Sequence, residues 1–228
     1  MAEERNGGID AILFDIDGTL ISTGGASTIA WRRAFEELHG IPVDITQYAS
    51  TGMTDPEVGK LSFRGALGHD PTKRELGQVM GLRLRYMPEE IERSDGYRVM
   101  PGVEELLKSL IDDGRLLGLT TGNVEAAGHI KLARANLNRF FSFGGYGSDS
   151  TDRVELTKRA LERARTVSGG EIEPAECIAV GDTPHDVTAA HGAGIREVGV
   201  ATGKFTVDQL REAGADHVVA TLEEGLPL

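Results

Sequence analysis

Two aspartates one residue apart follow the first apolar run of the chain. Residues 9–14 are mostly apolar, and Asp15-Ile16-Asp17-Gly18-Thr19 comes directly after them. A carboxylate at the end of a core strand is costly unless it meets a cation or a hydrogen-bond donor, and carboxylate oxygens are ligands that Mg²⁺ prefers. The spacing therefore indicates a site for phosphoryl chemistry. The same Asp17-Gly18 pair is also typical of a simple turn.

Two more apolar runs end in polar residues of the same kind. The run at 178–180 leads into Gly181-Asp182-Thr183-Pro184-His185-Asp186, and the run at 115–119 leads into Thr120-Thr121-Gly122-Asn123. Open α/β sheets bind ligands at the carboxyl ends of their strands, so three such endings are expected to converge at one edge. Hydroxyls and backbone N–H groups at a helix start add an anion site there.

In this order the motifs resemble the haloacid dehalogenase superfamily, specifically its phosphoglycolate-phosphatase-like branch with a helical cap. The carrying residues are Asp15-x-Asp17-Gly18-Thr19, Thr121, Gly181-Asp182-x-x-x-Asp186 and Pro101-Gly102-Val103, and the resemblance covers about 9–219. The family usually places a lysine between the threonine and the Gly-Asp segment. Here Arg153 is the first candidate for that position and Lys158 the second.

The resemblance implies a covalent route through an aspartyl phosphate. Asp15 would be the nucleophile, an arrangement that divides one difficult step into two. Asp17 would be the general acid, donating a proton to the leaving alkoxide and then accepting one from water. Carboxylates in different environments can have their pKa values driven apart, so such a pair is chemically coherent.

The resemblance also implies how charge is neutralised. Mg²⁺ would be held by Asp15, the backbone carbonyl of Asp17 and Asp182, with Asp186 as an outer or further ligand. The phosphoryl group would be bound by Thr121, by the backbone N–H groups of Gly122 and Asn123, and by the guanidinium of Arg153. An ordinary helix entry at 121–123, and a surface arginine at 153 paired with Asp152 or Glu155, are the alternatives.

Composition limits the class of protein. The chain has 228 residues, 39% of them hydrophobic, which suits one α/β domain with an insert or two small domains. A formal net charge of −12 argues against nucleic acid or an anionic membrane as partner. A single cysteine, Cys177, excludes an internal disulfide framework. Because no apolar run approaches eighteen residues, we expect a cytoplasmic protein. The resemblance implies that it acts, as a monomer or homodimer, on a small phosphorylated metabolite.

Periodicity predicts a Rossmann-like parallel sheet with an inserted all-helical cap. Expected strands lie at 9–14, 115–120, 176–180, 196–200 and 216–219, and expected helices at 102–113, 124–136, 152–167, 186–191 and 207–212. Residues 9–21 and 100–228 would form the core, 22–99 the cap without strands, and 1–8 a disordered leader. An insert of this length requires a small core of its own.

Several alternatives stay open at this point. Cap arginines Arg64, Arg83 and Arg85 are candidates for binding an anionic substrate, or are simply solvated. The cap loop at 51–55 carries Met53 where many relatives carry a basic residue, which argues against a β-phosphoglucomutase-like phosphomutase without excluding it. A catalytically weak phosphate-binding protein with the same fold is the third possibility. Phosphoglycolate, a sugar phosphate, a nucleotide and pyrophosphate all remain possible substrates.

Overall fold

The core of the protein is a six-stranded sheet whose hydrogen-bonded neighbours are all parallel, as predicted. The computed structural model describes residues 9–170 and 172–228, so the predicted leader lies outside the described residues. The strand order is β5-β4-β1-β6-β7-β8. The strands are β1 (Ala11–Phe14), β4 (Leu116–Thr121), β5 (Phe143–Tyr146), β6 (Cys177–Gly181), β7 (Arg196–Val200) and β8 (His217–Val219).

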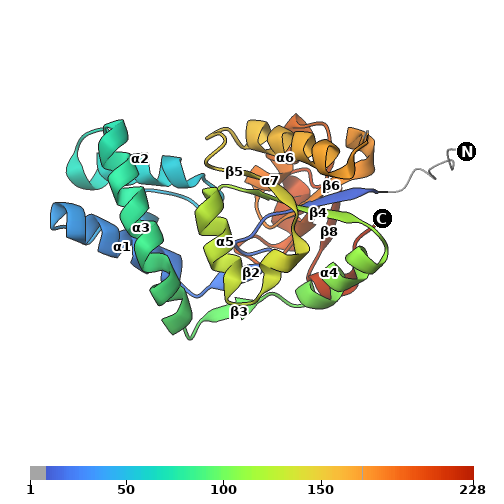
Figure 1. Cartoon of the computed structure of the whole chain (residues 1–228), viewed down its shortest axis with the longest axis horizontal. Coiled ribbons are helices and arrows are strands. Elements are labelled where there is room, and N and C mark those ends of the chain that lie inside the picture. Colours follow the sequence, from blue (N-terminus) through green and yellow to red (C-terminus); the bar gives the residue numbers. More distant parts are fainter. Residues whose placement is uncertain (1–8, 171) are drawn as a thin grey trace, which may run out of the picture.

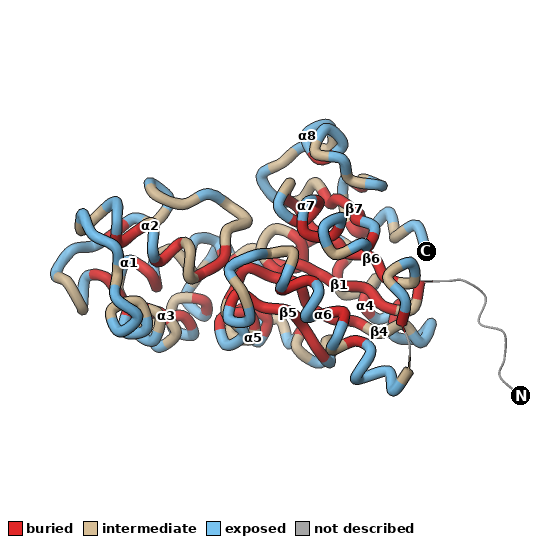
Figure 2. The backbone as a smooth tube through the Cα atoms, turned by 90° about the horizontal axis from the view of Figure 1, so that it is seen from above, coloured by how far each residue is buried: buried red, intermediate tan, exposed pale blue. Residues whose placement is uncertain are grey.

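Helices cover both faces of this sheet and bury a hydrophobic cluster on each. One cluster packs Ala11 and Leu13 of β1 against helical residues such as Leu161 and Ala190, and the other packs Ile12 and Phe14 against the opposite layer. The tube in Figure 2 is red along the central strands because both faces are covered. The core helices are α4 (Val103–Asp112), α5 (Glu125–Ala133), α6 (Arg153–Ser168), α7 (Pro184–Gly192) and α8 (Val207–Glu212).

A helical cap is inserted after β1, and a two-stranded antiparallel ribbon connects it to the core. Figure 1 shows the cap to one side of the sheet, with α5 between them. The ribbon pairs β2 (Ile21–Thr23) with β3 (Tyr97–Val99). The cap contains α1 (Ala26–His39), α2 (Asp55–Leu67) and α3 (Lys73–Arg93). Buried aromatic residues, among them Trp31, Phe35 and Phe63, give the cap its own core.

The fold class is confirmed, but three strands were not predicted. The expectation of an insert region without strands is wrong, because β2 and β3 lie within it; each has only three residues, too few for a periodic pattern. Strand β5 reads Phe143-Gly-Gly-Tyr146 and lacks the usual β-branched residues. Its glycines are explained by packing: a Cβ on Gly145 would lie 1.9 Å from the carbonyl oxygen of Leu156 in α6.

Short 3-10 helices complete the chain: η1 (Ile45–Gln47), η2 (Leu137–Phe140), η3 (Pro174–Glu176) and η4 (Leu222–Glu224). Among the residues that the structure describes, no helix combines the length and apolar character needed to cross a membrane.

Candidate active site

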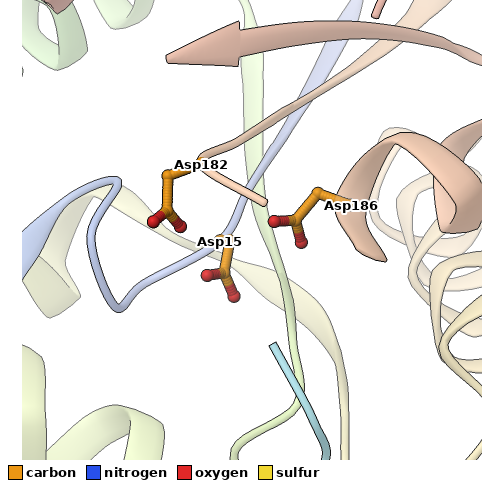
Figure 3. Close-up of side chains that lie close together, drawn as sticks. All are labelled: Asp15, Asp182 and Asp186. Carbon is orange, nitrogen blue, oxygen red and sulfur yellow. The ribbon is translucent and has the colours of Figure 1, made fainter. Parts of the chain in front are cut away.

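Three aspartates converge at the carboxyl end of the sheet. Asp15 follows β1, Asp182 follows β6, and Asp186 lies in the first turn of α7. One carboxyl oxygen from each lies within 4.8 Å of the others, and the residues are only 6%, 1% and 3% exposed. Figure 3 shows the three carboxyl groups turned toward a common space. The convergence predicted from the strand endings is therefore present in the structure.

The loop after β1 turns tightly to bring Asp15 and Asp182 together. Gly18 has φ +90°, and its N–H donates to the carbonyl of Ile21 at 2.8 Å. A Cβ on this glycine would lie 2.3 Å from Oδ2 of Asp182. A residue with a side chain would thus be strained here and would also displace the aspartate. The hydroxyl of Thr19 donates to Oδ1 of Asp182 at 3.5 Å.

Burial and mutual repulsion set the pKa values of these carboxyl groups. Burial and the neighbouring Asp186 raise the pKa of Asp15 to about 7, although Arg153 opposes this shift. Burial, Asp186 and Asp15 raise the pKa of Asp182 to about 9. Both shifts mean that the ionised cluster lacks positive charge. A divalent cation would supply it, so the donor set fits a metal site.

The three aspartates are not equally available to a metal. Asp186 Oδ2 accepts hydrogen bonds from the N–H and the hydroxyl of Thr183, at 3.0 and 2.7 Å, and its Oδ1 pairs with Arg153. The Asp182 carboxylate, by contrast, accepts a long hydrogen bond of 3.5 Å from the Thr19 hydroxyl. Asp15 and Asp182 are consequently better suited to direct coordination, and Asp186 to an outer position.

Arg153 reaches into the cluster from the first turn of α6. Its Nη2 pairs with Asp186 Oδ1 and lies 3.8 Å from Asp15 Oδ1, and its side chain is 10% exposed. Burial lowers the pKa of the guanidinium, but Asp186 and Asp15 more than offset this and raise it overall. Lys158, the other candidate, is exposed and pairs with Glu155 at 2.9 Å. Arg153 thus lies where the resemblance placed a cation, and Lys158 does not.

A second polar network connects Asp17 to the end of β4. The amide nitrogen of Asn123 donates to Asp17 Oδ2 and to the hydroxyl oxygen of Thr121, both at 2.8 Å. The ammonium of Lys131 lies 2.6 Å from both Asp17 Oδ2 and Asn123 Oδ1. Thr121 is fully buried, and together with Gly122 and Asn123 it lines a small cavity that also borders Asp15 and Asp17.

Lys131 was not predicted from the sequence. It belongs to the inward stripe of α5, together with Ala127, Gly128 and Leu132, and is 3% exposed. Burial alone would raise the pKa of Asp17, but Lys131 and the Asn123 amide hold it below its usual value. A lysine within an otherwise small and apolar helical stripe is the sequence signal that could have identified this residue.

The cap contacts the site through backbone and side-chain hydrogen bonds. The N–H of Asp55 donates to the Gly122 carbonyl at 2.8 Å, and Asp55 Oδ2 accepts from the Val124 N–H at 2.8 Å. Arg153 Nη1 donates to the Gly52 carbonyl at 2.9 Å. The cap loop therefore lies directly on the strand ends that carry the candidate catalytic residues.

The cap arginines do not face the site as free cations. Arg64 pairs with Asp70 and Arg85 with Glu37, and both arginine side chains are more than half exposed. Arg83 is fully buried, and its Nη1 lies 2.7 Å from Asp55 Oδ2. His185 is exposed at the start of α7.

This combination defines a class of protein: a parallel α/β core with aspartates at the strand ends and a helical cap over them. A family model described as haloacid dehalogenase-like hydrolase matches residues 9–194, and the chain belongs to that family. It is 26% identical to a probable phosphatase, IndB, of Dickeya dadantii, with 93% of this chain and 90% of the relative covered. It is 29% identical to a phosphoglycolate phosphatase of Nitrosospira multiformis, with 96% and 95% covered.

Solved structures show the same fold. A predicted phosphatase from Clostridium acetobutylicum superposes with a TM-score of 0.73 at 21% identity, with 95% of this chain and 96% of that chain covered. At such identity the likeness is evidence for the fold alone. The family match makes this chain a haloacid dehalogenase-like hydrolase, and both relatives named above are phosphatases by name.

Proposed function

We propose that this protein is a Mg²⁺-dependent phosphatase that hydrolyses a small-molecule phosphate monoester through an aspartyl phosphate on Asp15. The observation that carries the proposal is the convergence of Asp15, Asp182 and Asp186 around a common space, with the Arg153 guanidinium beside them. Phosphoryl transfer needs positioning and charge neutralisation above all, and this arrangement supports both.

Asp15 and Asp182 would hold the magnesium ion, with the Asp17 backbone carbonyl as a further ligand and Asp186 outside them. When bound, Mg²⁺ would offset the repulsion between the nucleophilic carboxylate and the phosphate oxygens. Arg153 would bind a phosphoryl oxygen while its contact with Asp186 holds the guanidinium in place. The Thr121 hydroxyl and the N–H groups of Gly122 and Asn123 would bind the remaining oxygens.

In the first step, a carboxylate oxygen of Asp15 attacks phosphorus, and the bond from phosphorus to the ester oxygen breaks. Asp17 gives its proton to the departing alkoxide. In the second step, Asp17 takes a proton from water, which attacks the phosphorus of the aspartyl phosphate and releases inorganic phosphate. Asp15 is then regenerated as a carboxylate.

Lys131 and Asn123 would set the protonation state and the orientation of the Asp17 carboxyl group. Without substrate they favour its ionised form, which suits the second step. A phosphate dianion bound beside Asp17 would raise the pKa of its carboxyl group, since like charges disfavour ionisation. The proton required in the first step is therefore taken up together with the substrate.

The test measures phosphate release and the covalent intermediate together. The wild-type protein should release inorganic phosphate from members of a phosphate-ester panel with Mg²⁺ and lose this activity in chelator. Acid-quenched single turnovers with ³²P-labelled ester should label the wild-type protein, whereas Asp15→Asn should show neither label nor turnover. Turnover that persists in Asp15→Asn would refute the nucleophile and the covalent route.

We propose in addition that 22–99 form the cap subdomain and that 9–21 with 100–228 form the core, in a cytoplasmic monomer or homodimer. Limited proteolysis should cut first near these boundaries, and size-exclusion chromatography with light scattering gives the oligomeric state. Cleavage first within the sheet would contradict the division.

A further inference from the structure

The cavity above Asp15 and Asp17 is small, and the cap forms much of its wall. Its volume is about 110 Å³. The phosphoryl group must lie at Asp15, so the group that leaves with the ester oxygen must face the cap. The cap residues that line this cavity are Ser27, Trp31, Ile45, Thr51, Gly52, Met53, Asp55 and Val58. A groove of about 730 Å³ shares part of this lining and leads outward.

Charge in this cavity is already paired. Lys131 contacts Asp17 and Asn123, each at 2.6 Å. Arg153 contacts Asp186 and the Gly52 carbonyl. These are the two basic residues among the described residues that line the cavity, and both come from the core.

The cap contributes a carboxylate to the wall and no basic residue, within the part of the chain that the structure describes. That carboxylate, Asp55, is balanced by the buried Arg83 behind it at 2.7 Å. Arg83 also lies over the Trp31 ring, 4.7 Å from its centroid, and so is held in the interior of the cap. The rest of the cap wall is apolar or bears neutral hydroxyls.

From these walls we infer that the leaving group of the substrate is an uncharged, hydroxyl-bearing organic group, such as a small polyol or sugar, and not a carboxylate or a second phosphate. The inference rests on the proposed function and specifies its substrate class. An anionic leaving group would be placed against Asp55, Asp17 and apolar side chains without a counter-ion, and unpaired buried charge is strongly disfavoured. Hydroxyl groups can instead exchange hydrogen bonds with Ser27 and Thr51.

The outer groove supports the same inference. Its cap wall adds further neutral hydroxyls, those of Thr23, Thr28, Thr46 and Ser50. The basic residues that it adds, His185 and Lys204, are exposed on the core rim. Exposed charges are screened by water and salt, so they attract an anion only weakly.

Two esters of nearly equal size test the effect of the charge on the leaving group alone. 2-Hydroxyethyl phosphate and phosphoglycolate differ only in a CH₂OH group against a carboxylate. With Mg²⁺ present, kcat/KM for the neutral ester should exceed that for phosphoglycolate by at least about tenfold. Calorimetric titration of both esters into Asp15→Asn with Mg²⁺ should show the same order of affinity without turnover.

A matched pair of variants tests the cap wall directly. Met53→Lys adds a cation of similar length and should reduce or reverse the preference, whereas Met53→Leu should keep it. Equal or better use of phosphoglycolate by the wild-type protein, in both kinetics and binding, would overturn the inference and leave the phosphatase proposal intact. Preferential binding of the neutral ester without any hydrolysis would instead reject the phosphatase proposal. Absence of binding by both esters would overturn the inference about the leaving group, whereas the ester panel described above decides the phosphatase proposal.

Discussion

Replacing Arg153 by methionine removes a positive charge from the carboxylate cluster while keeping an unbranched side chain. The guanidinium lies 3.8 Å from Asp15 Oδ1 and pairs with Asp186, and its side chain is only 10% exposed. Opposite unit charges about 4 Å apart interact by about 4 kcal/mol at an effective dielectric of about 20. The Arg153→Met variant also avoids the cost of burying a guanidinium, so its net loss of transition-state stabilisation is smaller than this interaction energy.

We expect a net loss of transition-state stabilisation of about 3 kcal/mol, which corresponds to a roughly 10²-fold fall in kcat/KM. Arg153→Lys is the matched control. It keeps the charge, but a single ammonium cannot reproduce both the Asp186 pair and the 2.9 Å hydrogen bond to the Gly52 carbonyl. Its loss should be roughly tenfold.

The assay is steady-state phosphate release over a range of Mg²⁺ concentrations, with thermal unfolding of each variant in parallel. Unfolding identifies variants that are simply misfolded. In the Arg153→Met variant the three converging carboxylates have no neighbouring guanidinium. The Tm of this variant should therefore rise more with Mg²⁺ than the wild-type Tm does. A kcat/KM for Arg153→Met within a factor of three of wild type, in a folded protein, would refute the reasoning.

Four further predictions concern single carboxylates or their partners. Asp17→Asn should slow turnover of alkyl phosphates far more than that of p-nitrophenyl phosphate, because only poor leaving groups need a proton; equal losses would remove the general-acid role. Lys131→Met should raise the pKa of Asp17 and shift the corresponding limb of the kcat/KM–pH profile to higher pH, and an unmoved limb would contradict the assignment. Asp182→Asn should abolish the rise in Tm produced by Mg²⁺, and a rise equal to that of wild type would exclude Asp182 as a ligand. Glu197 is fully buried, its oxygens lack hydrogen-bond partners among the described residues, and burial with Asp186 raises its pKa well above 4.5. Folded protein therefore keeps a proton that unfolded protein releases, and stability falls by up to about 1.4 kcal/mol per pH unit above the unfolded pKa. Glu197→Gln should raise the denaturation midpoint at pH 7 but not at pH 4; equal gains at both pH values would refute this explanation.

The sequence predicted the parts of the site that follow apolar strands. Asp15, Thr121 and Asp182 each come directly after a run of buried residues, and parallel topology brings such endings together without any knowledge of side chains. The same reasoning could not choose between Arg153 and Lys158. Helix α6 begins at Arg153, so this residue lies at the sheet edge, whereas Lys158 lies on the exposed face of the helix.

Contacts between distant segments were beyond sequence reasoning. Lys131 lies 114 positions from Asp17, and its place in the buried stripe of α5 marks it as unusual without identifying Asp17 as its partner. The same holds for Asp55, the first residue of α2, whose carboxylate accepts a hydrogen bond from the N–H of Val124 in the core. Strand β5 was not predicted because two of its four residues are glycines, which are uncommon in strands. Gly145 is needed there because α6 packs too closely for a side chain.

Because β2 pairs with β3, the cap begins and ends at adjacent positions and can be exchanged as a unit. The chain leaves and re-enters the core through neighbouring strands, with Ile21 opposite Val99 and Thr23 opposite Tyr97. Everything between these points can be replaced by another insert of any length without stretching a connection of the main sheet. Selection, or a protein engineer, could in this way change which esters are accepted while the strands that carry Asp15, Thr121 and Asp182 keep their pairing, provided that the new insert replaces the contacts of Gly52 and Asp55 with the site.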